Sequence, residues 1–173
     1  SKRIRAEALA GGTHPPTPDD MDFLTGVSDL TRQGALRFRE TDDAPFVSPD
    51  SAVPRLIELP ELLHASDVID TGGDDLASVK ALLGAGTGTL GGARPKASVR
   101  DDGALHVAKF PKPSDEWNVI AWEMTALDLA DDAGITVPRH RLVSVDGRNV
   151  LLLRRFDRNE AGRTGYMSAM TMM

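Results

Sequence analysis

The sequence predicts an α+β fold that combines antiparallel hairpins with packed helices. Two pairs of strand-like segments each surround an aspartate-glycine turn, the first at residues 101–103 and the second at 146–147. Aspartate-glycine between apolar runs is a strong hairpin signal. Apolar residues at helical spacing mark three helices, near residues 56–63, 75–83 and 117–132. Hairpins interleaved with helices of this kind predict a mixed α+β protein.

Composition narrows the class of protein. A chain of 173 residues allows one domain or two small ones, and its 40% hydrophobic and 27% charged content is ordinary for a soluble globular protein. The net charge of −6 predicts no general attraction to nucleic acid or to an anionic membrane. No apolar run approaches the roughly 18 residues of a membrane-spanning helix, and no secretory h-region is present. We therefore expect a cytoplasmic protein with no membrane partner.

Two further features of the composition concern chemistry and completeness. The chain has no cysteine, which removes disulfides, thiolate zinc sites and cysteine nucleophiles together. His14 has no second ligand at useful spacing, so no metal site is predicted. The chain begins with Ser1 and stops inside an apolar segment at Met173, which suggests that both ends are cut.

The first half of the chain predicts short elements joined by loops. Residues 2–10 have the composition of a short basic helix, and the glycines and prolines of 11–18 form a strap that breaks it. A helix is expected over residues 22–30 with Asp19 or Asp20 as its cap. Apolar and polar residues alternate over 35–39, which predicts a short strand, and residues 41–53 are predicted to form a polar loop. Two amphipathic helices follow, separated by residues 70–75.

A glycine-rich loop precedes the first hairpin. Five of the nine residues from Gly84 to Gly92 are glycine, and two cations, Arg94 and Lys96, follow at once. Such a loop can turn its N–H groups toward an anion, most plausibly phosphate, although a flexible linker has the same composition. Residues 86–91 fit G-x-G-x-x-G, but a dinucleotide-binding motif needs a strand before it and a helix after it. Here a helix precedes and strands follow, so we keep an NAD-binding domain as a minor alternative.

A lysine and a glutamate in the segments after the loop predict a nucleotide lobe of the kinase type. Lys109 shares one face of the second strand with Leu105 and Val107. The helix over 117–132, with Ser114 or Asp115 as cap and Gly134 as its stop, places Glu123 on its apolar stripe. A carboxylate on that stripe needs a cation, and Lys109 is the natural candidate. Kinases use such a pair to hold nucleotide phosphates, whereas the alternative is a structural ion pair without a ligand.

The second hairpin predicts a sheet that is covered on both faces. Its second strand contains the continuous apolar run of residues 150–153. The run continues directly into Arg154-Arg-Phe-Asp-Arg158, which on composition alone is a solvated basic strand end.

Several segments, taken in order, resemble HipA-type serine/threonine kinases, the toxins of bacterial type II toxin–antitoxin systems. The similar segments are 22–38, 89–97, 108–111, 133–138 and 151–158, and together they cover most of residues 22–171. The resemblance implies the nucleotide-binding portion of such a kinase, with an N-lobe of antiparallel hairpins, a glycine-rich loop and packed helices. It also implies ATP and Mg²⁺ as cofactors. Thr89 stands where the family carries an autophosphorylated serine. The residues that the resemblance assigns to nucleotide binding are Gly91, Gly92, Ala93, Arg94, Pro95 and Lys96 of the loop, Lys109, Glu123, and the hinge residues Arg154, Arg155 and Phe156.

The catalytic residues of this family lie in a later lobe, on a His-Gly-Asp-type loop and a downstream metal-binding aspartate. No such motif occurs in the sequence, so we predict no catalytic residue here and no phosphate transfer by residues 1–173 alone. The expected organisation is a mainly helical segment with the strap (1–84), a nucleotide-binding lobe (85–158) and the start of a C-terminal lobe that also supplies the Mg²⁺ ligands (159–173).

The resemblance also implies partners. These are a small DNA-binding antitoxin, operator DNA reached through that antitoxin, and a translation-related protein substrate. The alternative function is a naturally truncated, non-catalytic module that binds an antitoxin or another partner.

Overall fold

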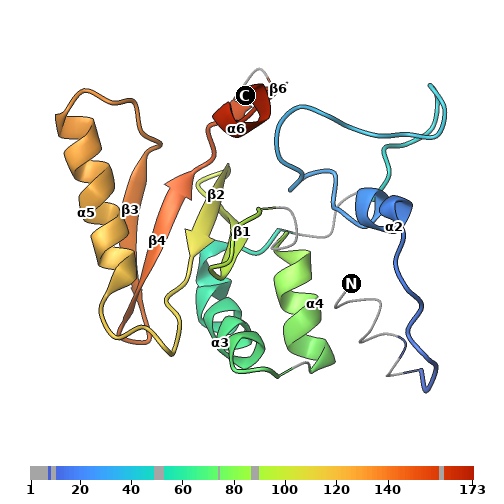
Figure 1. Ribbon diagram of the computed structural model, residues 1–173, viewed down its shortest axis with the longest axis horizontal. Coiled ribbons are helices and arrows are strands. Elements are labelled where there is room, and N and C mark those ends of the chain that lie inside the picture. Colours follow the sequence, from blue (N-terminus) through green and yellow to red (C-terminus); the bar gives the residue numbers. More distant parts are fainter. Residues whose placement is uncertain (1–7, 9–10, 49–52, 74, 87–89, 160–161) are drawn as a thin grey trace.

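The computed structural model confirms the α+β class, with one four-stranded antiparallel sheet at its centre (Figure 1). It describes residues 8, 11–48, 53–73, 75–86, 90–159 and 162–173. The strands are β1 (Lys96–Asp101), β2 (Ala104–Lys109), β3 (His140–Val145) and β4 (Arg148–Arg154), in the spatial order β1-β2-β4-β3. The sheet therefore consists of two hairpins that pair through β2 and β4.

Both predicted hairpins are confirmed, and their turns explain the sequence signal. Asp102 and Gly103 have φ of 45° and 77°, and Asp146 and Gly147 have φ of 49° and 73°. Two consecutive left-handed residues are the requirement of a type I′ turn, whose twist matches that of the strands. Pairing of β2 with β4 then places Lys109 opposite Leu151.

Helices cover both faces of the sheet. α3 (Leu59–Asp70) and α4 (Leu76–Gly84) follow a short 3₁₀ turn (Leu56–Glu58) and pack on one face, while α5 (Val119–Asp132) lies against β3 and β4 on the other (Figure 1). Three residues of the apolar run of β4, Val150, Leu151 and Leu152, are fully buried, which confirms that the sheet is covered on both sides. The core that α3 and α4 share with the sheet consists of Leu59, Leu62, Leu63, Ala65, Leu82, Ala85, Ala97, Val99, Ala108, Phe110, Val145, Val150 and Leu152.

Backbone contacts protect the outer edge of the sheet at β1. The N–H of Arg100 donates to the carbonyl of Pro54 (2.8 Å), and the N–H of Ser98 donates to the carbonyl of Ala85 (2.5 Å). The chain before α3 and the chain after α4 thus satisfy groups that an open edge strand would leave unpaired.

Three sequence-based expectations are corrected by the structure. α2 spans Asp20–Thr25 and is capped by Asp19 as expected, but it ends well before residue 30. No strand forms over residues 35–39: the carbonyl of Phe38 accepts the N–H of Val47 (2.8 Å), and the side chain of Arg37 pairs with Asp29. The long helix begins at Val119, where the side chain of Asn118 caps it. Asp115, one of the two expected caps, instead accepts the N–H of Lys112 and pairs with Arg94.

The C-terminal part adds a small hairpin of β5 (Arg158–Asn159) and β6 (Gly162–Arg163), followed by α6 (Ala169–Met172). The helix expected over residues 2–10 lies largely outside the described part of the chain. Within that part, no helix has the length and apolar character needed to cross a membrane.

Candidate functional site

The glycine loop connects the end of α4 to the start of β1. It therefore links a helix to a strand, the reverse of the order that a dinucleotide-binding motif requires, and the NAD-binding alternative is excluded. Gly91 and Gly92 have φ of 58° and 74°, so the chain turns at two consecutive left-handed positions that glycine adopts without strain. Thr89, the expected phosphorylation position, lies outside the described residues.

Lys96 lies beneath this turn. Its side chain is almost buried, with 9% of the residue exposed, and Nζ donates to the carbonyl of Gly91 at 2.6 Å. A Cβ placed on Gly92 would lie 3.0 Å from the same Nζ, so the loop backbone sits directly on the ammonium group. The N–H of Phe110 also donates to the carbonyl of Pro95 (3.0 Å), which fastens the loop to the end of β2.

The predicted contact between Lys109 and Glu123 is present. Nζ of Lys109 forms an ion pair with the Glu123 carboxylate, and the two side chains are 25% and 31% exposed. Glu123 lies on the stripe of α5 that begins with the buried Ile120, as expected. The pair is therefore partly shielded from bulk water.

A second lysine adjoins this pair. Lys96 is the ladder partner of Lys109, so two lysines stand on neighbouring strands, and Glu123 pairs with Lys109. Burial lowers the pKa of Lys96, and the charge of Lys109 lowers it further, while Glu123 opposes both effects. The two lysines and one glutamate sum to a net charge of +1 (2 − 1) in a partly desolvated place. An anion would relieve this imbalance, since electrostatic interactions strengthen where water is excluded.

The expected hinge segment follows β4 along the same part of the sheet. Arg154 and Phe156 are exposed, whereas Arg155 is only 4% exposed, and its N–H donates to the carbonyl of Leu105 at 2.9 Å. The sheet pairing therefore continues past the end of β4. A solvated basic strand end is thereby excluded for Arg155.

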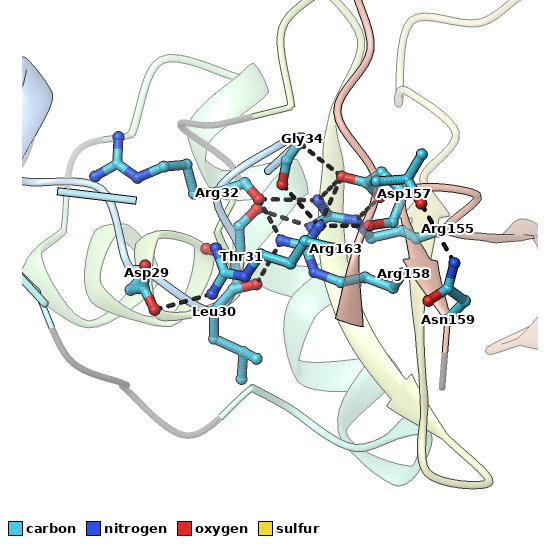
Figure 2. A network of polar contacts seen from close by, with 11 residues as sticks. Asp29, Leu30, Thr31, Arg32, Gly34, Arg155, Asp157, Arg158, Asn159 and Arg163 are labelled. Atoms are coloured by element: carbon cyan, nitrogen blue, oxygen red, sulfur yellow. Dashed lines mark hydrogen bonds and ion pairs between the residues drawn. The ribbon is translucent and has the colours of Figure 1, made fainter. Parts of the chain in front are cut away.

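Arg155 belongs to a buried network centred on Asp157 (Figure 2). The Arg155 guanidinium donates to both carboxylate oxygens of Asp157, at 2.8 and 2.6 Å. Arg158 donates to one of these oxygens at 2.9 Å, and the N–H of Gly34 donates to it at 2.8 Å. Burial alone would raise the pKa of Asp157, but hydrogen bonds from Arg155 and Gly34 and the charges of both arginines outweigh it. The net result is a pKa below the ordinary value.

The same arginines hold the N-terminal part of the chain. Arg155 donates to the carbonyls of Thr31 (2.8 Å) and Arg32 (3.1 Å), and Arg158 donates to those of Leu30 (3.2 Å), Arg32 (2.5 Å) and Gly34 (3.1 Å). Figure 2 shows both guanidinium groups directed into this run of carbonyls. Residues 30–34 and 155–158 are thus joined by charge-assisted bonds, which are stronger than neutral ones.

A second carboxylate, Asp29, extends the network. It accepts three hydrogen bonds from Arg37, the shortest at 2.5 Å, and one from Arg163 at 2.9 Å. Burial would raise the pKa of Asp29, but the bonds and charges of Arg37 and Arg163 lower it overall. Residues 29–37 are therefore attached both to the hinge and to β6.

No local sequence pattern predicted this network. Asp29 and Arg32 appeared only within a family-like segment, and Asp157 was not assigned a role. The sequence did contain a signal for such a network, because Arg-Arg-Phe-Asp-Arg directly follows a strand that is covered on both faces. Arginines that close to a buried strand need carboxylates or carbonyls as partners.

No metal site is evident in the part of the chain that the structure describes. No group of three or more histidine, aspartate or glutamate side chains is arranged there to hold an ion. The described residues therefore do not offer Mg²⁺ a set of ligands, and Glu123 is already engaged by Lys109.

Comparison with known proteins supports a family. Residues 88–173 match the family model of the HipA-like C-terminal domain. The match includes both hairpins, Lys109, α5 and the hinge segment, and it supports the HipA family for this part of the chain. The family description calls this a C-terminal domain, whereas we expected an N-terminal portion of the parent protein. No match was found among curated proteins or among solved structures.

Proposed function

We propose that this chain is the ATP-binding part of a HipA-like serine/threonine protein kinase. The observation that carries the proposal is the group formed by Lys96, Lys109 and Glu123 under the glycine loop. A glycine-rich loop, a strand lysine and a helix glutamate are the parts with which kinases hold nucleotide phosphates. The family-model match covers the later part of the loop, the strand lysine and the helix glutamate, which supports the same reading.

Each residue of the group has a chemical role in this proposal. Lys109 supplies the charge that contacts the phosphates, and Glu123 orients it. Lys96 holds the loop backbone through the carbonyl of Gly91 and adds a second positive charge. Arg94 is held beside the loop by an ion pair with Asp115.

The hinge would receive the base of the nucleotide. Leu151, the ladder partner of Lys109, precedes Arg154 by three residues. At about 3.3 Å per residue the hinge begins about 10 Å from the lysine. Because the N–H groups of Arg154 and Arg155 already donate to the carbonyls of Arg139 and Leu105, we expect other backbone groups of the hinge Arg154–Phe156 to meet the base while the phosphates reach Lys109.

The wider function rests on the family match alone. In this proposal the parent protein is a cytoplasmic toxin that phosphorylates a translation-related protein and is neutralised by a small DNA-binding antitoxin. The antitoxin connects it to operator DNA. Phosphorylation of Thr89 would place about −1.5 to −2 charges in the loop that receives ATP, and would therefore inhibit binding.

The test is the affinity of the chain for ATP, measured by calorimetry on the wild-type protein and on two lysine variants. Lys109→Ala removes the proposed phosphate contact and is expected to weaken binding at least tenfold. Lys112→Ala is the matched control, because Lys112 is 26% exposed and also forms an ion pair, with Asp70 of α3 at 2.7 Å. We expect it to leave the ATP affinity unchanged.

The outcome separates the two functions under consideration. An ATP affinity that is lost in Lys109→Ala but kept in Lys112→Ala supports the kinase lobe. A wild-type chain that binds no ATP would contradict the proposal and favour the non-catalytic interaction module instead.

A further inference from the structure

One segment of the chain contacts both ends of the proposed nucleotide site. We call residues 29–34 the brace. Its carbonyls accept the guanidinium groups of Arg155 and Arg158 at the hinge, and its Thr31 side chain packs against Gly86 at the base of the glycine loop. The brace comes from the part of the chain before α3, outside the region that matches the family model.

Contact at the hinge end is dense and buried. Arg155 and Asp157 have side chains that are 3% and 4% exposed, and Arg158 is 13% exposed. Each of the carbonyls at Leu30, Thr31, Arg32 and Gly34 accepts at least one guanidinium bond. An arrangement with this many charge-assisted bonds has little freedom, because each shift would leave a buried donor without an acceptor.

Contact at the loop end depends on the absence of a side chain. A Cβ on Gly86 would lie 2.6 Å from both Cβ and Oγ1 of Thr31. Thr31 is fully buried, so the brace and the start of the glycine loop are in van der Waals contact with no intervening space.

We propose that the brace is a positioning element that fixes the hinge backbone for recognition of the nucleotide base. Asp157, next to the hinge, is the key residue of the contact with the brace, since it orients Arg155 and Arg158 and accepts the N–H of Gly34. This inference rests on the proposed nucleotide-binding function. It adds that recognition of the base depends on a segment far away in sequence, whereas phosphate binding depends on Lys109.

The experiment separates the two halves of the ligand. Adenosine probes the hinge and tripolyphosphate probes the lysines, and both affinities are measured by calorimetry. We expect Asp157→Asn to weaken adenosine binding at least tenfold and to change tripolyphosphate binding by less than twofold. Lys109→Ala is expected to give the reverse pattern. A simple loss of stability would not weaken the binding of one probe and spare the other.

Asp67→Asn is the matched control, because it makes the same chemical change in a carboxylate that pairs with Arg148 on the α3 side of the sheet. It should alter neither affinity. Arg155→Lys is the second hinge variant, used if Asp157→Asn does not fold. It keeps the charge but loses the forked donor geometry, and should weaken adenosine binding selectively.

The results distinguish failure of this inference from failure of the proposed function. A wild-type chain that binds neither probe overturns both. A wild-type chain that binds both probes, with hinge variants that bind adenosine normally, overturns the role of the brace alone. Selective loss of adenosine binding supports it.

Discussion

Substitution of Gly86 by alanine should be unusually destabilising, because two separate penalties act at this position. Gly86 has φ of 69°, a conformation that costs a residue with a side chain roughly 1–2 kcal/mol. The new Cβ would also lie 2.6 Å from two atoms of the fully buried Thr31. Overpacking of this kind costs about 1–3 kcal/mol. The sum is a loss of about 2–5 kcal/mol in the free energy of unfolding.

A matched variant isolates the packing part of this loss. Gly147 has nearly the same φ, 73°, but a Cβ there would meet no atom within 4 Å. Gly147→Ala should therefore cost only the conformational penalty of roughly 1–2 kcal/mol. Urea denaturation followed by far-ultraviolet circular dichroism measures both variants. If Gly86→Ala were no more destabilising than Gly147→Ala, the contact between the brace and the glycine loop would be refuted.

Three other perturbations test the fold and its ion pairs. The pKa of His140 is raised first by a hydrogen bond to the carbonyl two residues earlier and then by Asp128, at 2.9 Å. The stabilisation of the fold by protonated His140 should be complete below about pH 6.5 and should be lost as the pH rises through the higher folded-state pKa. An NMR titration that gives His140 a pKa at or below 6.5 would contradict this. Arg148 donates two bonds to Asp67 but is 37% exposed, so a double-mutant cycle should give a coupling of about 1 kcal/mol or less, and a larger value would show that solvent does not screen the pair. Leu152→Ala should cost about 2–5 kcal/mol in urea denaturation, because Leu152 is fully buried in the central strand, and a loss under about 1 kcal/mol would be inconsistent with that position.

Local patterns in the sequence were sufficient for the elements around the site. The aspartate-glycine turns fixed both hairpins, because few residues adopt two consecutive left-handed conformations. The contact between Lys109 and Glu123 was predictable because strand and helix periodicities each direct one charged side chain toward the same apolar layer. These interactions are set within short stretches of the chain.

Other features could not be predicted locally. The bond between Arg155 and Thr31 joins residues 124 positions apart, and nothing in either segment specifies the other. The alternating pattern of residues 35–39 predicted a strand, yet Arg37 turns to Asp29 and the guanidinium stacks on Phe46, 3.4 Å from the ring centroid. Tertiary partners override the local preference of such a short segment.

The site shows how these two kinds of information combine. Periodicity and turn chemistry place the lysines and the glycine loop, while the buried arginine network places the hinge relative to them. Sequence patterns therefore locate the proposed phosphate-binding end, but the position of the proposed hinge depends on residues 29–34, whose contacts are visible only in three dimensions.

In the proposed function, one ligand occupies the glycine loop, Lys109 and the hinge together. The most direct test is an NMR titration of the ¹⁵N-labelled chain with ATP, followed through the backbone amide shifts. We expect the largest shifts in Gly91–Lys96, at Lys109 and across Arg154–Phe156, with the turns at Asp102–Gly103 and Asp146–Gly147 unchanged. Saturable shifts confined to other parts of the chain, or none at all, would contradict the account.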